Sequence, residues 1–192
     1  MRKQFASYSV AICGLGGLGS NVAVMLARAG VKKLHLLDFD QVEVSNLNRQ
    51  QYMPSQLGMA KTEALRDILL NIRPDLELKI DTVRITENNL CELLKNEEII
   101  CEAFDDAEAK AMLVNGIMEH FPEKYLVAGS GMAGMGSAND IRTRKITSRF
   151  YLCGDEVSEV EDIPEMISSR VMVCAAHQAH MILRIMAGET EA

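Results

Sequence analysis

The sequence predicts an α/β fold of the Rossmann-like type, in which a mostly parallel sheet carries helices on both faces. Apolar runs of strand length alternate with stretches of helical periodicity along the whole chain. A glycine cluster joins the first apolar run to the first helical stretch. The chain has 192 residues, of which 48% are hydrophobic, so we expect a single domain over 1–192 with one continuous core.

The first third of the chain predicts two strands that flank a helix. Residues 9–13 are a short apolar run, and residues 33–38 predict the second strand. Residues 20–29 repeat apolar side chains at helical spacing, and Gly30 is a typical C-terminal stop. The polar segment 40–54 has neither period, so we expect it to be irregular.

The second third repeats the alternation. Residues 59–72 predict a helix that ends before Pro74, because the residue before a proline avoids the helical conformation. Residues 76–83 alternate in polarity as a strand does, and residues 98–103 predict another buried strand. A short helix is expected between them, at 87–95.

The remainder of the chain follows the same pattern with one irregular, glycine-rich stretch. The expected elements are a helix at 107–119, a strand at 125–128, a flexible glycine and methionine segment at 129–136, a strand at 141–146, an acidic loop at 149–164 and a closing helix at 168–187.

Charge and hydropathy exclude several classes of protein. The chain carries 27 acidic and 20 basic side chains, a formal net charge of −7, which disfavours a nucleic-acid binder because phosphate contacts require basic surface. No stretch approaches the roughly 20 apolar residues of a membrane-spanning helix. We therefore expect a cytoplasmic protein without nucleic-acid or membrane partners.

The cysteines predict free thiols. They number five, at positions 13, 91, 101, 153 and 174, and none lies in a C-x-x-C pair. An odd count without paired spacing is typical of a reducing compartment. Hence we predict neither disulfides nor a structural zinc site.

A phosphate-binding loop is the first functional motif. Gly14, Gly16 and Gly19 have G-x-G-x-x-G spacing between a predicted strand and a predicted helix. Glycines let backbone amides approach a phosphate, and the helix start adds partial positive charge. Asp38 ends the next strand, near the spacing of about 20 residues at which a carboxylate binds ribose hydroxyls. NAD, FAD and ATP all fit these residues, and a structural turn is the alternative.

Charged residues elsewhere favour a triphosphate. Arg49 follows the ribose acid and Lys61 opens the next helix. Asp105 and Asp106 follow a further strand, at the sheet edge where α/β proteins bind ligands. Two cations can neutralise a phosphate chain, and a carboxylate can hold Mg²⁺, a set that hydride transfer does not need.

Five short strings carry a family resemblance. They are G-L-G-G-L-G-S at 14–20, D-F-D at 38–40, S-N-L-N-R-Q at 45–50, G-x-x-K at 58–61 and the acidic pair at 105–106. Together they resemble the ThiF/MoeB/HesA adenylyltransferases, bacterial relatives of ubiquitin-activating enzymes. The similarity covers about residues 9 to 188 in order, and S-N-L-N-R-Q is its most specific string.

The resemblance implies an activity and a set of roles. Members bind ATP·Mg²⁺ and adenylate the C-terminal Gly-Gly carboxylate of a small ubiquitin-fold carrier protein, and they form homodimers. By position, Gly17 approaches the phosphates, Asp38 binds the ribose, and Asp105 contributes to Mg²⁺ binding. Asn46, Arg49 and Lys61 contact the phosphates, and Arg49, Lys61 and Asp105 are the expected catalytic residues. The remaining expected nucleotide-binding residues are Gly14, Gly16, Gly19, Asp40, Ser45, Asn48 and Asp106.

The stretches at 126–136 and 150–155 resemble the short ThiF-like proteins of thiamine biosynthesis. This implies a ThiS-like sulfur carrier, thiamine thiazole biosynthesis and a sulfur donor as a second partner. Cys153 lies where relatives place loop cysteines, so it is a candidate nucleophile towards the acyl-adenylate; the alternative is an inert surface thiol. Met132 and Met135 either line a channel for the Gly-Gly tail or fill gaps in the core.

Two other functions remain open at this point. One is an NAD-binding oxidoreductase or redox sensor that shares only the glycine turn. The other is a catalytically silent scaffold that binds nucleotide and carrier. His35 lies inside a predicted strand, and we interpret it as a hydrogen-bonded packing residue rather than a ligand.

Overall fold

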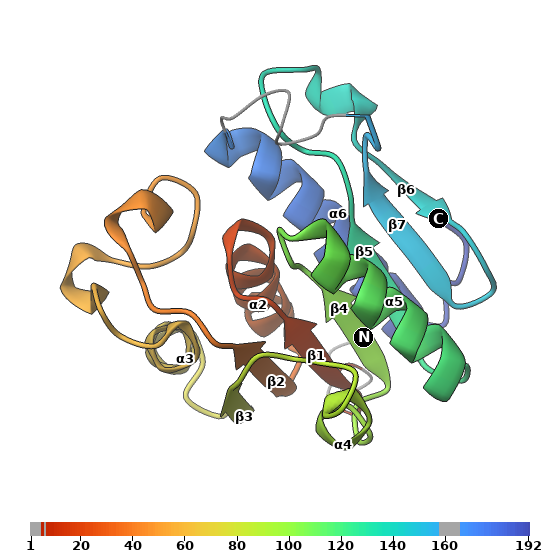
Figure 1. Cartoon of the computed structure of the whole chain (residues 1–192), viewed down its shortest axis with the longest axis horizontal. Helices are drawn as coiled ribbons and strands as arrows, with labels where there is room; N and C mark the ends of the chain where they lie inside the picture. Colours follow the sequence, from red (N-terminus) through yellow and green to blue (C-terminus); the bar gives the residue numbers. More distant parts are fainter. Residues whose placement is uncertain (1–4, 6, 158–165) are drawn as a thin grey trace.

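The strands of the protein form one sheet in the computed structural model, which describes residues 5, 7–157 and 166–192 (Figure 1). They are β1 (Ser9–Cys13), β2 (Lys33–Asp38), β3 (Glu77–Thr82), β4 (Ile99–Glu102), β5 (Tyr125–Gly129), β6 (Arg142–Lys145) and β7 (Phe150–Gly154). Over the described residues the order is β3-β2-β1-β4-β5-β7-β6. Only the pair formed by β6 and β7 is antiparallel, so the predicted mostly parallel sheet is confirmed.

Helices cover both faces of this sheet, as predicted. They are α2 (Gly17–Ala29), α3 (Lys61–Ile72), α4 (Leu90–Leu93), α5 (Ala107–His120) and α6 (Ser168–Met186), with 3-10 turns η1 (Val44–Asn46), η2 (Pro54–Gln56) and η3 (Ala138–Asp140). Figure 1 shows α4 and α5 on one side of the sheet, and α2 packed beside α6 on the other. Helix α3 shares the core of α2 and α6.

The alternation of side chains along a strand explains the two-faced core. In β1, Val10 and Ile12 join the cluster under α2, α3 and α6, whereas Ala11 and Cys13 join the cluster under α4 and α5. Successive strand residues point to opposite faces, so a parallel strand covered on both faces must be apolar throughout. This is why β1 and β5 appear in the sequence as nearly unbroken apolar runs.

One predicted loop is a strand. The expected acidic loop at 149–164 begins instead with β7, which pairs with β5 on one side and β6 on the other. Tyr151 and Cys153 are buried in the core, so the apolar run F-Y-L-C had strand character that its charged flanks obscured. The part of that predicted loop at 158–164 lies outside the described residues.

The topology places a ligand site at one edge. The chain passes from β1 to β2 on one side and later returns to β4 on the other side of β1. In open α/β sheets, the crevice at such a switch point lies at the carboxyl ends of the strands. The segments that follow β1, β2 and β4 therefore meet there.

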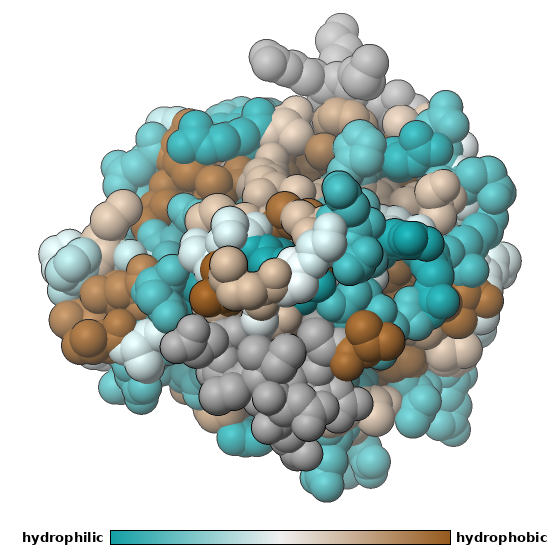
Figure 2. Space-filling model, turned by 90° about the horizontal axis from the view of Figure 1, so that it is seen from above, coloured by the Kyte–Doolittle hydropathy of each residue, from teal (hydrophilic) through white to brown (hydrophobic). Residues whose placement is uncertain are grey.

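Large exposed apolar side chains are scattered. In the view from above, brown hydrophobic groups are separated by teal hydrophilic ones (Figure 2). The exposed residues of this kind are Phe39, Val44, Met53, Leu57, Met118, Met135, Ile146, Val157 and Met172. Among the described residues, no helix has the length and apolar character needed to cross a membrane.

His35 is a hydrogen-bonded packing residue, as predicted. It is buried on β2, with Nδ1 2.8 Å from Glu97 Oε1 and Nε2 2.7 Å from Asp81 Oδ2. Burial raises the pKa of the Glu97 carboxyl. The hydrogen bond and charge of His35, together with a backbone hydrogen bond and the charge of Lys79, lower it, so the net pKa lies below its usual range. Glu97 therefore stabilises the fold above its unfolded-state pKa, and this contribution is lost as the pH falls through the folded pKa.

We expect His35→Leu to lower the free energy of unfolding by roughly 3 kcal/mol near neutral pH, because it leaves Glu97 buried without its partner. The loss should shrink at acidic pH, below the lowered pKa of Glu97, where this carboxyl is protonated in both proteins. Urea unfolding at the two pH values measures this. His180→Leu, at an exposed histidine, is the matched control. An equal loss at both pH values would contradict the role assigned to Glu97.

Candidate functional site

The glycine loop between β1 and α2 is shaped by close backbone contacts. Gly14 has φ +91°, and a Cβ there would lie 2.8 Å from the carbonyl oxygen of Ala103. A Cβ on Gly19 would collide with the carbonyl oxygen of Gly14. At Gly16, by contrast, the nearest atom to an added Cβ is 3.8 Å away. Packing of the chain itself therefore requires glycine at 14 and 19, but not at 16.

The start of α2 is free to attract an anion. Among the residues that the structure describes, no side chain caps it, and its first turn contains no acidic residue. The unpaired amides and the partial positive charge of a helix N-terminus make such a start an anion-binding site. This is the feature that the glycine spacing predicted.

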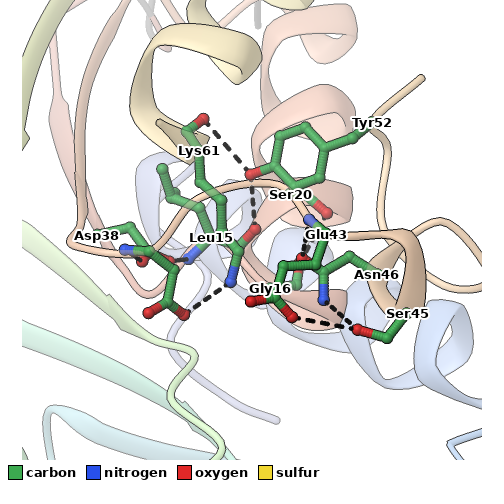
Figure 3. Close-up of polar contacts among 10 residues, drawn as sticks. Leu15, Gly16, Ser20, Asp38, Glu43, Ser45, Asn46, Tyr52 and Lys61 are labelled. Atoms are coloured by element: carbon green, nitrogen blue, oxygen red, sulfur yellow. Dashed lines mark hydrogen bonds and ion pairs between the residues drawn. The ribbon is translucent and has the colours of Figure 1, made fainter. Parts of the chain in front are cut away.

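Asp38 lies directly beneath this loop. Its Oδ2 accepts a hydrogen bond from the amide of Leu15 at 2.6 Å, and its Oδ1 accepts one from the amide of Asp40 at 2.8 Å (Figure 3). Burial raises the pKa of the Asp38 carboxyl, although Lys61 opposes the shift. Each carboxylate oxygen can accept a further bond, so Asp38 can shape the loop and still receive ribose hydroxyls.

Lys61 and Asp40 form an ion pair beside Asp38. Lys61 Nζ lies 2.8 Å from Asp40 Oδ2, and the Lys61 amide donates to the Asp40 carbonyl at 2.9 Å. The Lys61 side chain is 8% exposed and that of Asp40 is 47% exposed. Asp40 is one of the expected nucleotide-binding residues. In the structure it contacts Lys61, a catalytic candidate.

The segment after β2 folds back over α2 and orients Arg49. Arg49 Nη1 donates to the Ser45 carbonyl at 3.0 Å and to Asn48 Oδ1 at 3.1 Å. Asn21 of α2 donates to the Arg49 carbonyl at 3.1 Å, and the Arg49 side chain lies against Gly17. Ser45 and Asn48 thus hold the arginine at the glycine loop.

Asn46 is buried within the same segment and stabilises its turn. Its Oδ1 accepts a hydrogen bond from the amide of Glu43 at 3.0 Å, and its Nδ2 lies 3.4 Å from Ser45 Oγ (Figure 3). The expected contact of Asn46 with phosphates stays a prediction.

Tyr52 is a site residue that sequence reasoning missed. Its buried hydroxyl donates to the Leu15 carbonyl at 2.8 Å and lies 3.5 Å from the Lys61 carbonyl (Figure 3). Burial raises the pKa of this phenol, so it remains a donor. The available signal was a single aromatic residue within the polar segment 40–54.

The two acidic residues after β4 have different surroundings. Asp106 is the N-cap of α5, and its Oδ1 accepts a hydrogen bond from the Ala109 amide at 2.8 Å. Asp105 is exposed at the same turn. The described residues contain no group of three or more metal-ligating side chains. Mg²⁺ in nucleotide sites often has only one or two protein carboxylates besides phosphate oxygens, so Asp105 fits that role.

Cys153 does not lie on a loop. It is buried on β7, its Sγ is 3.6 Å from Thr143 Oγ1, and burial raises the pKa of its thiol to about 12. A buried thiol with this pKa carries little thiolate at neutral pH and is a poor nucleophile. The expected loop position is therefore wrong, and the catalytic interpretation loses its support.

We expect Cys153→Ala to keep the activity of the wild-type chain within about 2-fold, because core substitutions of this size affect stability rather than the site. ATP–pyrophosphate exchange by the variant and by the wild-type chain measures this. A loss of more than about 100-fold in a folded variant, comparable with loss of a catalytic group, would restore the nucleophile hypothesis.

The two methionines of the glycine segment differ. Met132 is 8% exposed and belongs to the core under α6, whereas Met135 is 82% exposed. Arg170 Nη1 donates to the Ala133 carbonyl between them at 2.6 Å. The gap-filling interpretation thus applies to Met132, while Met135 remains available to a partner.

A known family and several known proteins match this chain over most of its length. The model of the ThiF family matches residues 1–192. Ubiquitin-like modifier-activating enzyme 5 of Caenorhabditis briggsae is 33% identical over 186 residues, which cover 91% of this chain and 42% of the relative. The Gallus gallus protein of the same name is 30% identical over 187 residues, which cover 91% of this chain and 46% of that relative. The chain thus spans less than half the length of these relatives.

Solved structures show the same fold. E. coli tRNA N6-threonylcarbamoyladenosine dehydratase, TcdA, in complex with AMP superposes with a TM-score of 0.88 at 20% identity, covering 98% of this chain and 89% of that chain. E. coli MccB with ATP gives a TM-score of 0.75 at 22% identity, and the match covers 99% of this chain and 59% of that chain. A further MccB structure contains AMPCPP and MccA.

Proposed function

The chain belongs to the ThiF family, and from this premise we propose that it is an ATP-dependent adenylyltransferase that activates a C-terminal carboxylate of a small protein. One observation carries the proposal. Lys61, Arg49 and the uncapped start of α2 surround one glycine loop at the switch point of the sheet. Two cations and the unpaired amides of a helix start thus lie where a triphosphate would lie, beside the acidic residues Asp38 and Asp40.

The chemistry explains why this charge is needed. A carboxylate oxygen of the substrate attacks the α-phosphorus of ATP, a new P–O bond forms, and the bond to the β-phosphate breaks to release pyrophosphate. Both reactants are anionic, so the enzyme must screen their repulsion and align them. Arg49 and Lys61 supply the screening, and Asp38 beneath the loop orients the ribose.

Asp40 gives Lys61 a partner until nucleotide arrives. The Lys61 side chain is nearly buried, and an isolated buried charge would be costly. Asp40 is half exposed, so water solvates its carboxylate when Lys61 turns to a phosphate. Magnesium, when bound at Asp105, would neutralise phosphate charge, while the residues of the chain hold the nucleotide in place.

The substrate is proposed from the relatives. Two of them are named as ubiquitin-like modifier-activating enzymes, and MccB has been solved with MccA, which supports a small protein or peptide partner. A net charge of −7 favours a protein over an RNA substrate. The Gly-Gly terminus, a ThiS-like carrier, the thiamine pathway, a sulfur donor, a homodimer and cytoplasmic location remain finer proposals.

ATP–pyrophosphate exchange tests this function. The purified chain is assayed with ATP·Mg²⁺ alone and with small ubiquitin-fold carriers that end in Gly-Gly, each compared with a carrier that lacks the two glycines. Exchange that requires an intact carrier terminus is the expected result. Exchange without any carrier, or none with every carrier, would refute the proposal.

Nucleotide binding, together with the exchange assay, distinguishes the adenylyltransferase from the two alternative functions. An oxidoreductase or redox sensor should bind NAD, whereas we expect calorimetric binding of ATP·Mg²⁺ and none of NAD. A silent scaffold would bind ATP and carrier yet catalyse no exchange.

A further inference from the structure

A buried ion pair lies next to the candidate site and has no role in the function proposed so far. Glu102 is the last residue of β4 and is 1% exposed. Lys110, in the first turns of α5, places Nζ 3.0 Å from each of the two Glu102 carboxylate oxygens. Carboxylates are rarely buried to this degree unless they are paired, so the pair is integral to this corner of the fold.

The pair also holds the turn between β4 and α5. The Phe104 amide donates to Glu102 Oε1 at 2.7 Å, and Lys110 Nζ donates to the Phe104 carbonyl at 2.8 Å. An ammonium group has three protons, and all three have acceptors here. Both polar groups of the Phe104 backbone are thus bound by side chains of the pair.

This turn carries Asp105 and touches the glycine loop. The Ala103 amide donates to the Cys13 carbonyl at 2.9 Å, and the Ala103 carbonyl closely approaches Gly14. Asp105 itself is exposed, so its direction depends on the backbone that precedes it. A shift of residues 103–106 would therefore move the acidic side chain relative to the phosphate loop.

The charge of Lys110 is also needed to balance the charge of Glu102. Burial raises the pKa of the Glu102 carboxyl, and Lys110 opposes this shift. Without the lysine, an ionised Glu102 would add uncompensated negative charge near the expected triphosphate.

We propose that Glu102 and Lys110 form a positioning pair for adenylation, fixing the 103–106 turn so that Asp105 faces the nucleotide. The inference depends on the proposed function. Lys110 and Glu102 touch no substrate in this proposal; they act through the backbone of the turn.

The first test compares Lys110→Met with Lys110→Arg. We expect Lys110→Met to lower kcat for pyrophosphate exchange by about 100-fold, because small misplacements of an aligned group have effects of this size. KM for ATP should change by less than about 3-fold, since Arg49 and Lys61 remain to bind the phosphates. Lys110→Arg keeps charge and donors and should restore most of the rate. Lys95→Met, which breaks the exposed Lys95–Glu92 pair, is the matched control.

A double variant guards against a purely structural effect. Glu102→Gln with Lys110→Met leaves no buried unpaired charge, so it should fold even if Lys110→Met does not. A wild-type rate in this folded double variant would overturn the proposal. In the cycle of Lys110→Met with Asp105→Asn, non-additive effects on kcat are expected, and additive effects would count against the proposed route through Asp105.

Amide hydrogen exchange gives a readout that does not depend on activity. The Phe104 amide should be protected in the wild-type chain and lose protection in Lys110→Met. If wild-type protein shows no carrier-dependent exchange of pyrophosphate, the proposed function fails on its own. Unchanged protection across 103–106 in Lys110→Met would instead refute the positioning pair.

Discussion

Replacing Lys61 with alanine should reduce ATP–pyrophosphate exchange by at least about 100-fold, the scale seen when one preorganised charge or donor is removed from an active site. The fold should persist. Lys61 has one side-chain partner among the described residues, Asp40, whose half-exposed carboxylate stays solvated when the ammonium is removed. The loss should therefore appear in activity and not in urea unfolding.

Arg49→Ala should have a similar effect for the same reason. Its guanidinium contacts the Ser45 carbonyl and the Asn48 side chain at the surface, so its removal leaves no buried group unpaired. Lys33→Ala, at an exposed lysine at the amino end of β2, changes the net charge equally at the opposite edge of the sheet. That control should keep the wild-type rate. Wild-type exchange in both site variants would show that the assigned phosphate contacts are wrong.

Gly19→Ala should destabilise the chain by roughly 3 kcal/mol and abolish nucleotide binding, because an added methyl group would collide with backbone that cannot easily move. The collision is with the Gly14 carbonyl, inside the phosphate loop itself. Relief requires the loop and the start of α2 to separate. Urea unfolding together with calorimetric titration of ATP·Mg²⁺ measures both effects.

Gly16→Ala is the matched comparison for Gly19→Ala. An added Cβ there meets only the Gln50 side chain, at 3.8 Å, so the fold should tolerate it. A methyl group at the loop surface would nevertheless obstruct the approach of a phosphate to the backbone amides. We expect near wild-type stability with weakened ATP binding. Equal losses of stability in the two variants would contradict the distinction drawn between these glycines.

Most of the fold could be predicted from the sequence because its central strands are buried on both faces. A strand such as β1 must then be apolar at every position, and its neighbour α2 must show helical spacing. These signals are local and strong. The same reasoning failed at β7, where charged residues flank a five-residue strand and composition favoured a loop.

The candidate site was less predictable in its details. The pairing of Asp40 with Lys61 joins residues 21 positions apart, and the Tyr52 hydroxyl reaches a carbonyl 37 positions away. Spacing along the chain contains no information about such contacts. Cys153 was expected on a loop, yet burial on β7 raises the pKa of its thiol.

Sequence alone determined the class of this protein: an α/β fold, a glycine loop followed by an acid, and the cations that favour a triphosphate. Periodicity and motif spacing are properties of neighbouring residues, so they are visible without coordinates. Only the tertiary structure decided which glycines the backbone requires, that Lys61 is paired with Asp40, and that Glu102 and Lys110 hold the turn before Asp105. Burial and long-range contact set those roles, and both arise only when distant segments pack together.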